Sequence, residues 1–453
     1  MLVGHKLLDS QTGTFNMNTE NRGARPRLNQ IAILVVLLIA ALLAAGVKGD
    51  SSGAVNYGPA TSKLMALVEA DPDLKSMLSA SIEQARQINP DRSTNPAQSL
   101  EEYFDFVSWA ETAMPWALLR KPEYPEIYDN IFQSLVYFNF LIEQPLPELE
   151  GKGLVSNTLQ YFEPFASWLN VFTQSWGSFL DTRESWNETY YEMALNDPAF
   201  GLQNDWYEDP GNWSTFNEFF ARYLKSPAMR PIEAPLDDSV VTSFADSVPQ
   251  GVWAIDENSN LVAQDAVPLK ASSLRSVERL IGEDSEYSNA FANGTFTHSF
   301  LNVNDYHRYH FPLAGTIREV RIIPGINVTG GSIWWDAANS RYAFDPSERL
   351  GWQSIETRGC VILETDRHGL VALLPIGMTA VSSVNLEDNV KPGAKVKKGD
   401  MLGHFAFGGS DFVMVFQDTV DFTLDAPREA NNESYQHLLV GERLGRLTLR
   451  ESD

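Results

Sequence analysis

The run KKGDMLGHFAFGGSDFVMVFQ, residues 397–417, contains the feature that decides the fold and the chemistry of this chain. Two glycines, Gly408 and Gly409, stand before Ser410 and between two apolar stretches that are typical of β-strands. Glycine permits backbone geometries that are closed to other residues, so the Ser410 hydroxyl could reach the carbonyl of Gly409. Reaction at that bond would cut the chain and convert Ser410 into a new group. The alternative is an ordinary Gly-Gly turn followed by an uninvolved serine, which is common loop chemistry.

The C-terminal half of the chain is predicted to be β-rich. From residue 231 to residue 453, short apolar runs are separated by Gly, Pro and Asp, which is typical of strands and turns. The clearest predicted strands are GTIREVRIIPG (315–325), CVILETD (360–366), LVALLPIGM (370–378) and DFVMVF (411–416). The single cysteine, Cys360, excludes an intrachain disulfide and is expected to be a buried apolar residue.

The preceding region, residues 48–230, is predicted to be helical and rich in aromatic residues. In the segment 61–87, apolar residues recur every three or four positions, and Pro72 opens a helix with Asp71 as its cap. Seven of the eleven tryptophans lie between Trp109 and Trp213, many at helical spacing. We interpret them as a helical core; the alternative is an aromatic or lipid-binding groove. Helices followed by a β-rich region indicate the α+β fold class.

The N-terminus contains a candidate membrane anchor. After a tail of residues 1–30, the run IAILVVLLIAALLAAGV, residues 31–47, is apolar without a break. At 1.5 Å per residue it spans about 25 Å, the lower limit for a transmembrane helix. Basic residues in the tail place the N-terminus in the cytoplasm and the rest of the chain on the non-cytoplasmic side. The alternative is a cleaved signal peptide, which would release an exported protein.

The net charge of the 453 residues is −25. Such acidity argues against nucleic acid as a partner, and against a broad electrostatic patch for anionic lipid.

Four segments occur in an order that resembles the pyruvoyl-dependent phosphatidylserine decarboxylase proenzyme family. They are FNEFFARYLKSPAMRPI (216–232), DDSVVTSFADS (237–247), LNVNDYHRYHFPLAGTIREVRIIPG (301–325) and the glycine-serine run that ends at residue 410. The double glycine and the long helical region resemble a divergent branch. That branch includes fungal decarboxylases that act on free aromatic amino acids.

The resemblance implies self-cleavage. Ser410 would attack the carbonyl of Gly409, with His310 activating the serine and Asp246 orienting that histidine. The products would be a chain that ends at Gly409 and a chain that begins with a pyruvoyl group, which together form a two-chain assembly. The pyruvoyl group would be the cofactor that takes up the electron pair left on the substrate's α-carbon when CO₂ departs, and His307 would then protonate that carbon.

The resemblance also implies a substrate. Phosphatidylserine would be converted into phosphatidylethanolamine in phospholipid biosynthesis, and Arg308, with Arg318 and Arg321 nearby, is a candidate contact for its phosphate. Asp411 stands where the family usually has Ser or Thr. We expect its carboxylate beside the reactive group, where it would influence substrate binding. The alternatives are a free aromatic amino acid such as tryptophan, or a non-enzymatic binding module that retains the fold. The His-x-x-His spacing lacks a further ligand motif, so we expect no metal.

Overall fold

The computed structural model describes residues 56–112, 114, 131–152, 156–262, 275–329, 332–345, 351–378, 383–430 and 434–451. Residues 57–453 form one compact unit, which holds both the helical and the β-rich region. The tail, residues 1–30, and the apolar run, residues 31–47, lie outside the described residues, so the anchor stays a prediction. Within the described ranges, no helix is both long enough and apolar enough to cross a bilayer.

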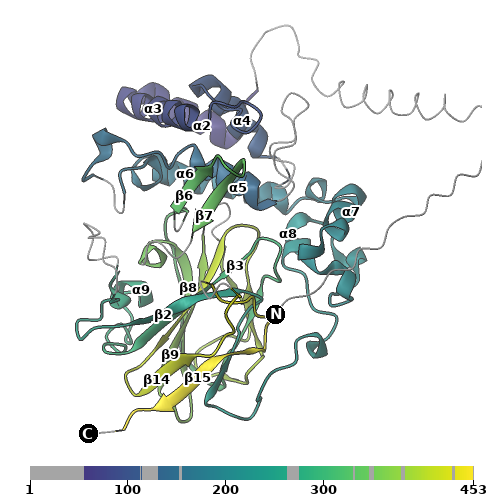
Figure 1. Cartoon of the computed structure of the whole chain (residues 1–453), viewed down its shortest axis with the longest axis vertical. Coiled ribbons are helices and arrows are strands. Elements are labelled where there is room, and N and C mark those ends of the chain that lie inside the picture. The colour runs from purple at the N-terminus through teal and green to yellow at the C-terminus, as the bar shows by residue number, and fades with distance from the viewer. Residues whose placement is uncertain are drawn as a thin grey trace, which may run out of the picture. The chain divides into compact units, whose positions relative to one another are not determined.

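Helices make up the first part of this unit (Figure 1). They are α2 (Pro59–Ala70), α3 (Pro72–Ile88), α4 (Leu100–Ala110), α5 (Ile131–Phe140), α6 (Phe165–Leu180), α7 (Glu188–Asn196) and α8 (Phe216–Phe220), and α9 (Val277–Ile281) follows in the β-rich part. Short 3-10 helices lie at Pro147–Leu149, Leu159–Tyr161, Arg183–Ser185, Pro198–Phe200, Leu202–Asn204, Pro210–Asn212, Pro227–Met229 and Trp352–Ser354.

Local sequence explains where the second of these helices begins. The Asp71 side chain accepts hydrogen bonds from the backbone N–H groups of Asp73 and Leu74, at 3.0 Å each. Pro72 follows as the first helical residue, where its missing N–H costs nothing. The predicted cap is therefore confirmed.

The aromatic residues of the helical region form a core. Trp168 and Trp176 on α6 are buried, and Phe172 between them stacks on Phe138 of α5 with ring centroids 4.7 Å apart. Large buried rings contribute most of the apolar area that such a helical layer removes from water. The core interpretation of the tryptophan spacing is confirmed for these residues.

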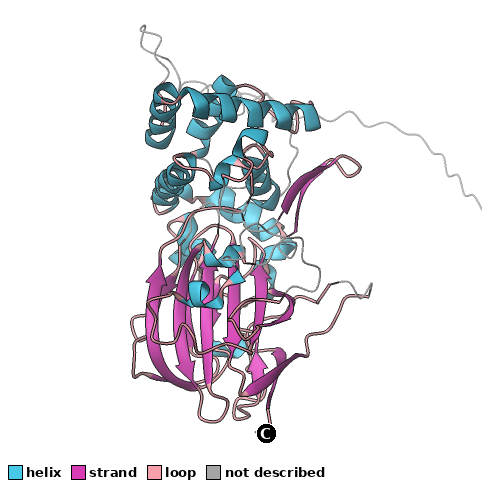
Figure 2. Ribbon diagram, turned by 90° about the vertical axis from the view of Figure 1, so that its left-hand side faces the viewer, coloured by secondary structure: helices cyan, strands magenta, loops and turns pink. Residues whose placement is uncertain are grey.

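The β-rich part is built on a seven-stranded sheet with the order β11-β5-β8-β9-β13-β3-β2. Figure 2 shows the strands side by side, with helices gathered at one end of them. The strands are β2 (Val248–Ala254), β3 (Thr295–Leu301), β5 (Gly315–Ile323), β8 (Thr357–Glu364), β9 (Leu370–Gly377), β11 (Lys395–Val396) and β13 (Ser410–Phe416). The four strands predicted most clearly are β5, β8, β9 and β13, so the α+β class is confirmed.

Smaller sheets complete the fold. Their orders are β10-β12-β4, β1-β15-β14 and the hairpin β6-β7. Their bounds are β1 (Val240–Thr242), β4 (Arg308–His310), β6 (Ser332–Asp336), β7 (Arg341–Asp345), β10 (Asn385–Leu386), β12 (Met401–His404), β14 (Val420–Leu424) and β15 (Arg443–Leu449).

Strand β13 separates two hydrophobic cores. Side chains alternate between the faces of a strand. Phe412, Met414 and Phe416 accordingly join the large core that continues into the helices, whereas Val413 and Val415 join a second core. The second core also contains the fully buried Cys360, as expected for a small apolar residue.

The β6-β7 hairpin ties the β-rich part to helix α5. Gln133 and Tyr342 are joined by two hydrogen bonds. The Gln133 Nε2 donates to the Tyr342 carbonyl at 2.6 Å, and the Tyr342 backbone N–H donates to the Gln133 Oε1 at 2.8 Å. Tyr137 of α5 packs on the same tyrosine, with ring centroids 5.4 Å apart. Residues of α5 and of the hairpin also line one cavity with Gly409, so the helical region lies close to the end of β13 at which Ser410 stands.

Candidate active site

Ser410 is the first residue of the central strand β13. It pairs with Leu301 of β3 on one side and with Gly377 of β9 on the other. Gly408 has a φ angle of 151°, which glycine adopts without strain and which lets the chain turn into the strand. The Ser410 hydroxyl is buried and has no hydrogen-bond partner in the described part of the chain. A buried polar atom without a partner is costly, and such atoms are found at sites of chemistry.

The carbonyl next to this hydroxyl is already held by a donor. The backbone N–H of Met378 donates a hydrogen bond to the oxygen of Gly409, at 2.9 Å. A backbone donor on this oxygen would stabilise negative charge that develops there when a nucleophile attacks the carbonyl carbon.

The Ser410 face of β13 is directed at the segments that carry Asp246 and His310. Phe412 lies two residues further along the strand, about 7 Å away on the same face. Its ring stacks on Phe244 with centroids 3.9 Å apart and meets Tyr309 at 5.6 Å. Phe244 and Tyr309 stand two residues and one residue before the predicted acid and the predicted base.

The acid, Asp246, is paired with an arginine. Arg230 donates two hydrogen bonds to its carboxylate, at 3.0 and 2.5 Å, and both side chains are almost completely buried. The Val440 N–H donates a third, at 2.8 Å. No hydrogen bond between Asp246 and His310 occurs in the described structure, although the His310 N–H bonds to the Phe244 carbonyl at 2.7 Å. Arg230 was part of the quoted motif, but its role was missed.

His310 is held as a neutral imidazole with one basic nitrogen. Its Nδ1 lies 2.9 Å from the carbonyl oxygen of Gly399, which can only accept, so Nδ1 carries the proton. Its Nε2 lies 3.2 Å from the Tyr306 hydroxyl. Burial lowers the pKa of His310 below its usual value. The ring lines a pocket of about 530 Å³ together with Arg230 and Lys398.

His307 also carries its proton on Nδ1, but its Nε2, unlike that of His310, has no hydrogen-bond partner among the described residues. Its Nδ1 donates to the Asp305 carbonyl at 2.9 Å, and its Nε2 has no partner in the described part of the chain. The ring stacks on Phe220 with centroids 3.7 Å apart. Burial, together with the nearby charge of Arg222, holds the pKa of His307 well below its usual value. It would therefore have to take up a proton before it could donate one.

Arg222, from the same motif as Arg230, fixes the backbone before His307. It is fully buried and donates to the carbonyls of Asn304 and Asp305, at 3.0 and 3.1 Å. Its guanidinium lies over the Tyr207 ring, 4.4 Å from the centroid. A buried charge needs such partners. The sequence did contain a signal for this role, because Arg222 is an arginine inside an otherwise mostly aromatic run.

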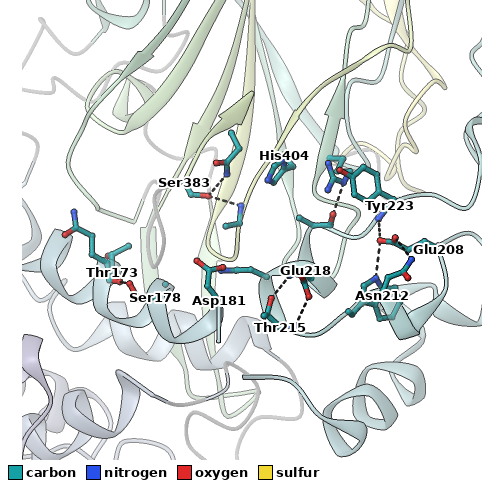
Figure 3. Close-up of a pocket in the computed structure, with 18 residues that line it drawn as sticks. Thr173, Ser178, Asp181, Glu208, Asn212, Thr215, Glu218, Tyr223, Ser383 and His404 are labelled. Carbon is teal, nitrogen blue, oxygen red and sulfur yellow. Dashed lines mark hydrogen bonds between the residues drawn. The ribbon is translucent and has the colours of Figure 1, made fainter. Parts of the chain in front are cut away.

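Arg308 lines a pocket of about 690 Å³, but its guanidinium is engaged. It donates to the Ala221 carbonyl at 2.8 Å, lies 3.3 Å from a Glu387 oxygen and covers the Tyr223 ring at 3.3 Å. Burial and the charge of Arg308 lower the pKa of His404, in the same pocket, to about 4. Figure 3 shows three carboxylates in this pocket, those of Asp181, Glu208 and Glu218. The pocket therefore contains more negative than positive side chains.

Asp411 lies on the other face of β13. Both carboxylate oxygens are 3.1 Å from Nδ1 of His298, one is 3.4 Å from Nε2 of Gln353, and the carboxylate and the imidazole are fully buried. The His298 ring stacks on Trp253 at 5.2 Å. The predicted substrate contact of Asp411 stays a prediction, and these contacts do not support it. His298 was missed because its partner lies 113 residues away.

The residues at this site fit the formation of a pyruvoyl group. The serine hydroxyl is buried without a partner among the described residues, two glycines precede it, and the neighbouring carbonyl has a donor. In the described ranges, no group of three or more His, Cys, Asp or Glu side chains is arranged to hold a metal ion.

Comparison with known proteins identifies similar chains. A family profile described as phosphatidylserine decarboxylase matches residues 216–446. The phosphatidylserine decarboxylase proenzyme 2 of rice, Oryza sativa, is 36% identical over 53% of this chain and 36% of its own length. The phosphatidylserine decarboxylase proenzyme of Alcanivorax borkumensis is 30% identical over 58% of this chain and 87% of its own. The decarboxylase iboD of Amanita muscaria is 29% identical over 56% of this chain and 77% of its own length.

Proposed function

The chain belongs to the phosphatidylserine decarboxylase family, and from this premise we propose that it is a pyruvoyl-dependent decarboxylase that matures by cutting itself between Gly409 and Ser410. One observation carries this proposal. In the part of the chain that the structure describes, the Ser410 hydroxyl is buried without a partner, and the Met378 N–H already donates a hydrogen bond to the neighbouring Gly409 carbonyl. A serine so placed needs only a base to become a nucleophile.

His310 is the proposed base for this step, and Asp246 supports it. The pKa of His310 is lowered by burial, so the ring is neutral at neutral pH and can accept the serine proton. In the described structure the Ser410 hydroxyl has no partner, and His310 Nε2 lies against the Tyr306 hydroxyl. A rearrangement must therefore bring Ser410 and His310 together, and it must also bring Asp246 to the ring if Asp246 is to orient it. Catalytic hydrogen bonds are often long or absent before the reacting complex forms.

The two products of the cut would stay together. β13 is paired with β3 on one side and with β9 on the other over all seven of its residues. The short chain that begins at residue 410 therefore lies in the middle of the sheet, where strands of the long chain hold it on both sides.

The pyruvoyl group would supply an electron-accepting carbonyl for decarboxylation. His307 is the proposed proton donor to the substrate's α-carbon. Its Nε2 is free of partners in the described structure, and stacking on Phe220 holds the ring in place. Because the pKa of His307 is low, it can pass on a proton readily once it has received one.

Phosphatidylserine is the first candidate substrate, with phosphatidylethanolamine as the product. Support comes from the family match over residues 216–446 and from the names of the rice and Alcanivorax relatives. An anchor formed by residues 31–47, with the catalytic part on the non-cytoplasmic side, would keep the site next to lipid. A reporter that works only in the cytoplasm, fused after residue 453, should then be silent.

A free aromatic amino acid is the second candidate. The specific observation in its favour is that the guanidinium groups expected to bind phosphate are already engaged. Arg308 contacts Glu387, Arg318 pairs with Glu364 and Arg321 pairs with Asp284. A phosphate would have to displace these carboxylates, whereas an amino acid with an uncharged side chain would not.

Mass spectrometry of the purified protein tests the proposal. We expect a long chain that ends at Gly409 and a fragment of residues 410–453 with a blocked N-terminus. Ser410→Ala should remain one intact chain without activity, and Ser299→Ala, which changes a buried serine on β3, should be cut normally. Decarboxylation by an uncut chain would refute the mechanism, and an uncut, inactive but folded wild type would favour the binding-module alternative.

The substrate is tested on the cut protein. CO₂ release is measured from phosphatidylserine in detergent micelles and from tryptophan, tyrosine and phenylalanine, all at equal concentration. We expect release from phosphatidylserine. Turnover of a free amino acid with none on the phospholipid would replace the first candidate by the second and leave the self-cleavage mechanism unchanged.

A further inference from the structure

A small apolar cavity reaches the peptide bond at which the chain is proposed to be cut. Its volume is about 30 Å³, and Gly409 is part of its wall. Three parts of the molecule line it: Leu135, Val136 and Asn139 of α5, Thr329 with Ile333 and Phe344 of the β6-β7 region, and Phe300, Val303 and Met378 from the catalytic sheet and its loops.

The described lining residues carry no charge, and most are hydrophobic. Phe300 and Phe344 lie against each other with ring centroids 5.6 Å apart. The one unusual polar group is the Thr329 hydroxyl, which is buried and has no hydrogen-bond partner in the described part of the chain. This lining suits a hydrophobic group that carries one polar atom.

The cavity is too small for a ligand while the chain is intact. Sites for small molecules have volumes of about 300–1,000 Å³. One wall, however, is the residue that self-cleavage would free. Gly409 would lose its covalent bond to Ser410, and neither Gly408 nor Gly409 has a side chain to hold the new end in place. Phe407 would stay anchored by its N–H bond to Asn217 and by its packing on Trp176. The Gly409 oxygen would keep the hydrogen bond from the Met378 N–H. Only the last two residues of the long chain would be freed.

We propose that this cavity is the subsite for the hydrophobic group of the substrate, and that self-cleavage opens it. The inference rests on the proposed function, because the substrate must reach the reactive group at position 410, one bond from Gly409. The ligand chemistry is a hydrophobic group with one hydrogen-bonding atom. An acyl chain with its ester and an aromatic amino acid side chain both meet that description. Helix α5 precedes the family match at 216–446, so the helical region would contribute directly to substrate choice.

Binding of probes without an amine tests the subsite separately from the chemistry. The probes are 3-methylindole for the aromatic source and dihexanoylphosphatidylcholine, below its micellar concentration, for the lipid source. Titration calorimetry compares the cut wild type with the uncut Ser410→Ala chain. We expect one probe to bind the cut protein at least tenfold more tightly. Equal binding to both forms, or no binding of either probe to the cut protein, would overturn the proposal.

Two substitutions with a matched control locate the binding. Ile333 and Phe344 face each other across the hairpin, whereas Ala343 pairs with Trp334, so its side chain lies on the other face. We expect Ile333→Trp to weaken probe binding at least tenfold and to raise KM by a similar factor, while Ala343→Trp changes neither. Thr329→Val keeps the side-chain shape but removes the hydroxyl that would hydrogen-bond to the probe, so it should weaken probe binding about three- to tenfold.

The outcomes separate this inference from the proposed function. A denaturing gel of each sample shows whether the chain is cut. An uncut wild type would refute the proposed function, and with it the premise of the subsite. A cut, active wild type whose probe binding and KM do not respond to Ile333→Trp or Thr329→Val would refute the subsite alone. If Ile333→Trp fails to fold, Thr329→Val decides.

Discussion

Ser410 and Asp411 are neighbours on strand β13, yet their side chains have opposite surroundings. On the Ser410 face, the hydroxyl has no partner in the described structure, and the segments of Asp246 and His310 lie across from it. On the Asp411 face, the carboxylate is matched by His298 and Gln353. The difference indicates that one strand serves two purposes. One face leaves a polar group available for chemistry, and the other satisfies a buried charge to hold the strand in place.

The largest effect should come from the Ser410 face. His310→Ala removes the proposed base, and general-base catalysis contributes about 10²- to 10⁴-fold. We therefore expect self-cleavage to slow by at least about 100-fold, measured as the loss of uncut chain on denaturing gels over time. His368→Ala, a change to a histidine in a turn before β9, is the control and should mature normally. Cleavage at the wild-type rate in His310→Ala would assign the proton transfer to another group.

The second prediction concerns the pair that supports this face. Arg230→Met leaves the Asp246 carboxylate buried without its main partner. Removing one member of a buried ion pair costs about 3–5 kcal/mol of unfolding free energy. We expect a loss of that size in urea titration of the uncut Ser410→Ala chain. Arg230→Met combined with Asp246→Leu should recover part of it, because the unpaired charge is then gone. A stability unchanged by Arg230→Met would show that water reaches Asp246.

Acid sensitivity should originate at His404 on β12, the strand that pairs with β4. The pKa of His404 is lowered to about 4, so the folded chain keeps this ring neutral while the unfolded chain binds a proton below about pH 6.5. The stability that this ring contributes is present above pH 6.5 and is lost as the pH falls from there toward 4. His404→Gln should remove about 1–2 kcal/mol of this loss at pH 4.5, after allowance for partial exposure. Parallel urea titrations at pH 7 and pH 4.5 measure it, and the same pH dependence in both proteins would contradict the prediction.

The sequence predicted the strand and missed the division between its faces. The alternation of DFVMVF identified β13, and the Gly-Gly turn located its start. Asp411 was expected beside the reactive group because it is adjacent in sequence. A strand has a period of two residues, so adjacency places the two side chains on opposite faces. The partners could not be predicted, because His298 and Arg230 are 113 and 16 residues from the carboxylates that they contact. The histidine and serine motifs, by contrast, were specific enough to name the candidate site.

On the Asp411 face we expect an effect on stability rather than on cleavage. Asp411→Asn keeps the shape but replaces a charged acceptor of the His298 hydrogen bond with a neutral amide. The loss should be about 1–3 kcal/mol of unfolding free energy, while the rate of self-cleavage changes less than tenfold. Urea titration of the Ser410→Ala background and a cleavage time course of the single variant measure the two quantities. Arrested cleavage with unchanged stability would remove the distinction between the faces.

The smallest effect should come from outside both faces. Arg318 on β5 pairs with Glu364 on β8, and both side chains are nearly half exposed, at 44% and 45%. Exposed ion pairs contribute about 0–1 kcal/mol, because water and salt screen the charges and ordering the side chains costs entropy. Arg318→Gln should therefore change the unfolding free energy by less than about 1 kcal/mol. Since the guanidinium is already paired, its loss should leave KM for phosphatidylserine unchanged. A several-fold rise in that KM, without a rise for a free amino acid, would place the lipid phosphate at Arg318. The substrate would then lie along β5, away from the Gly409 cavity.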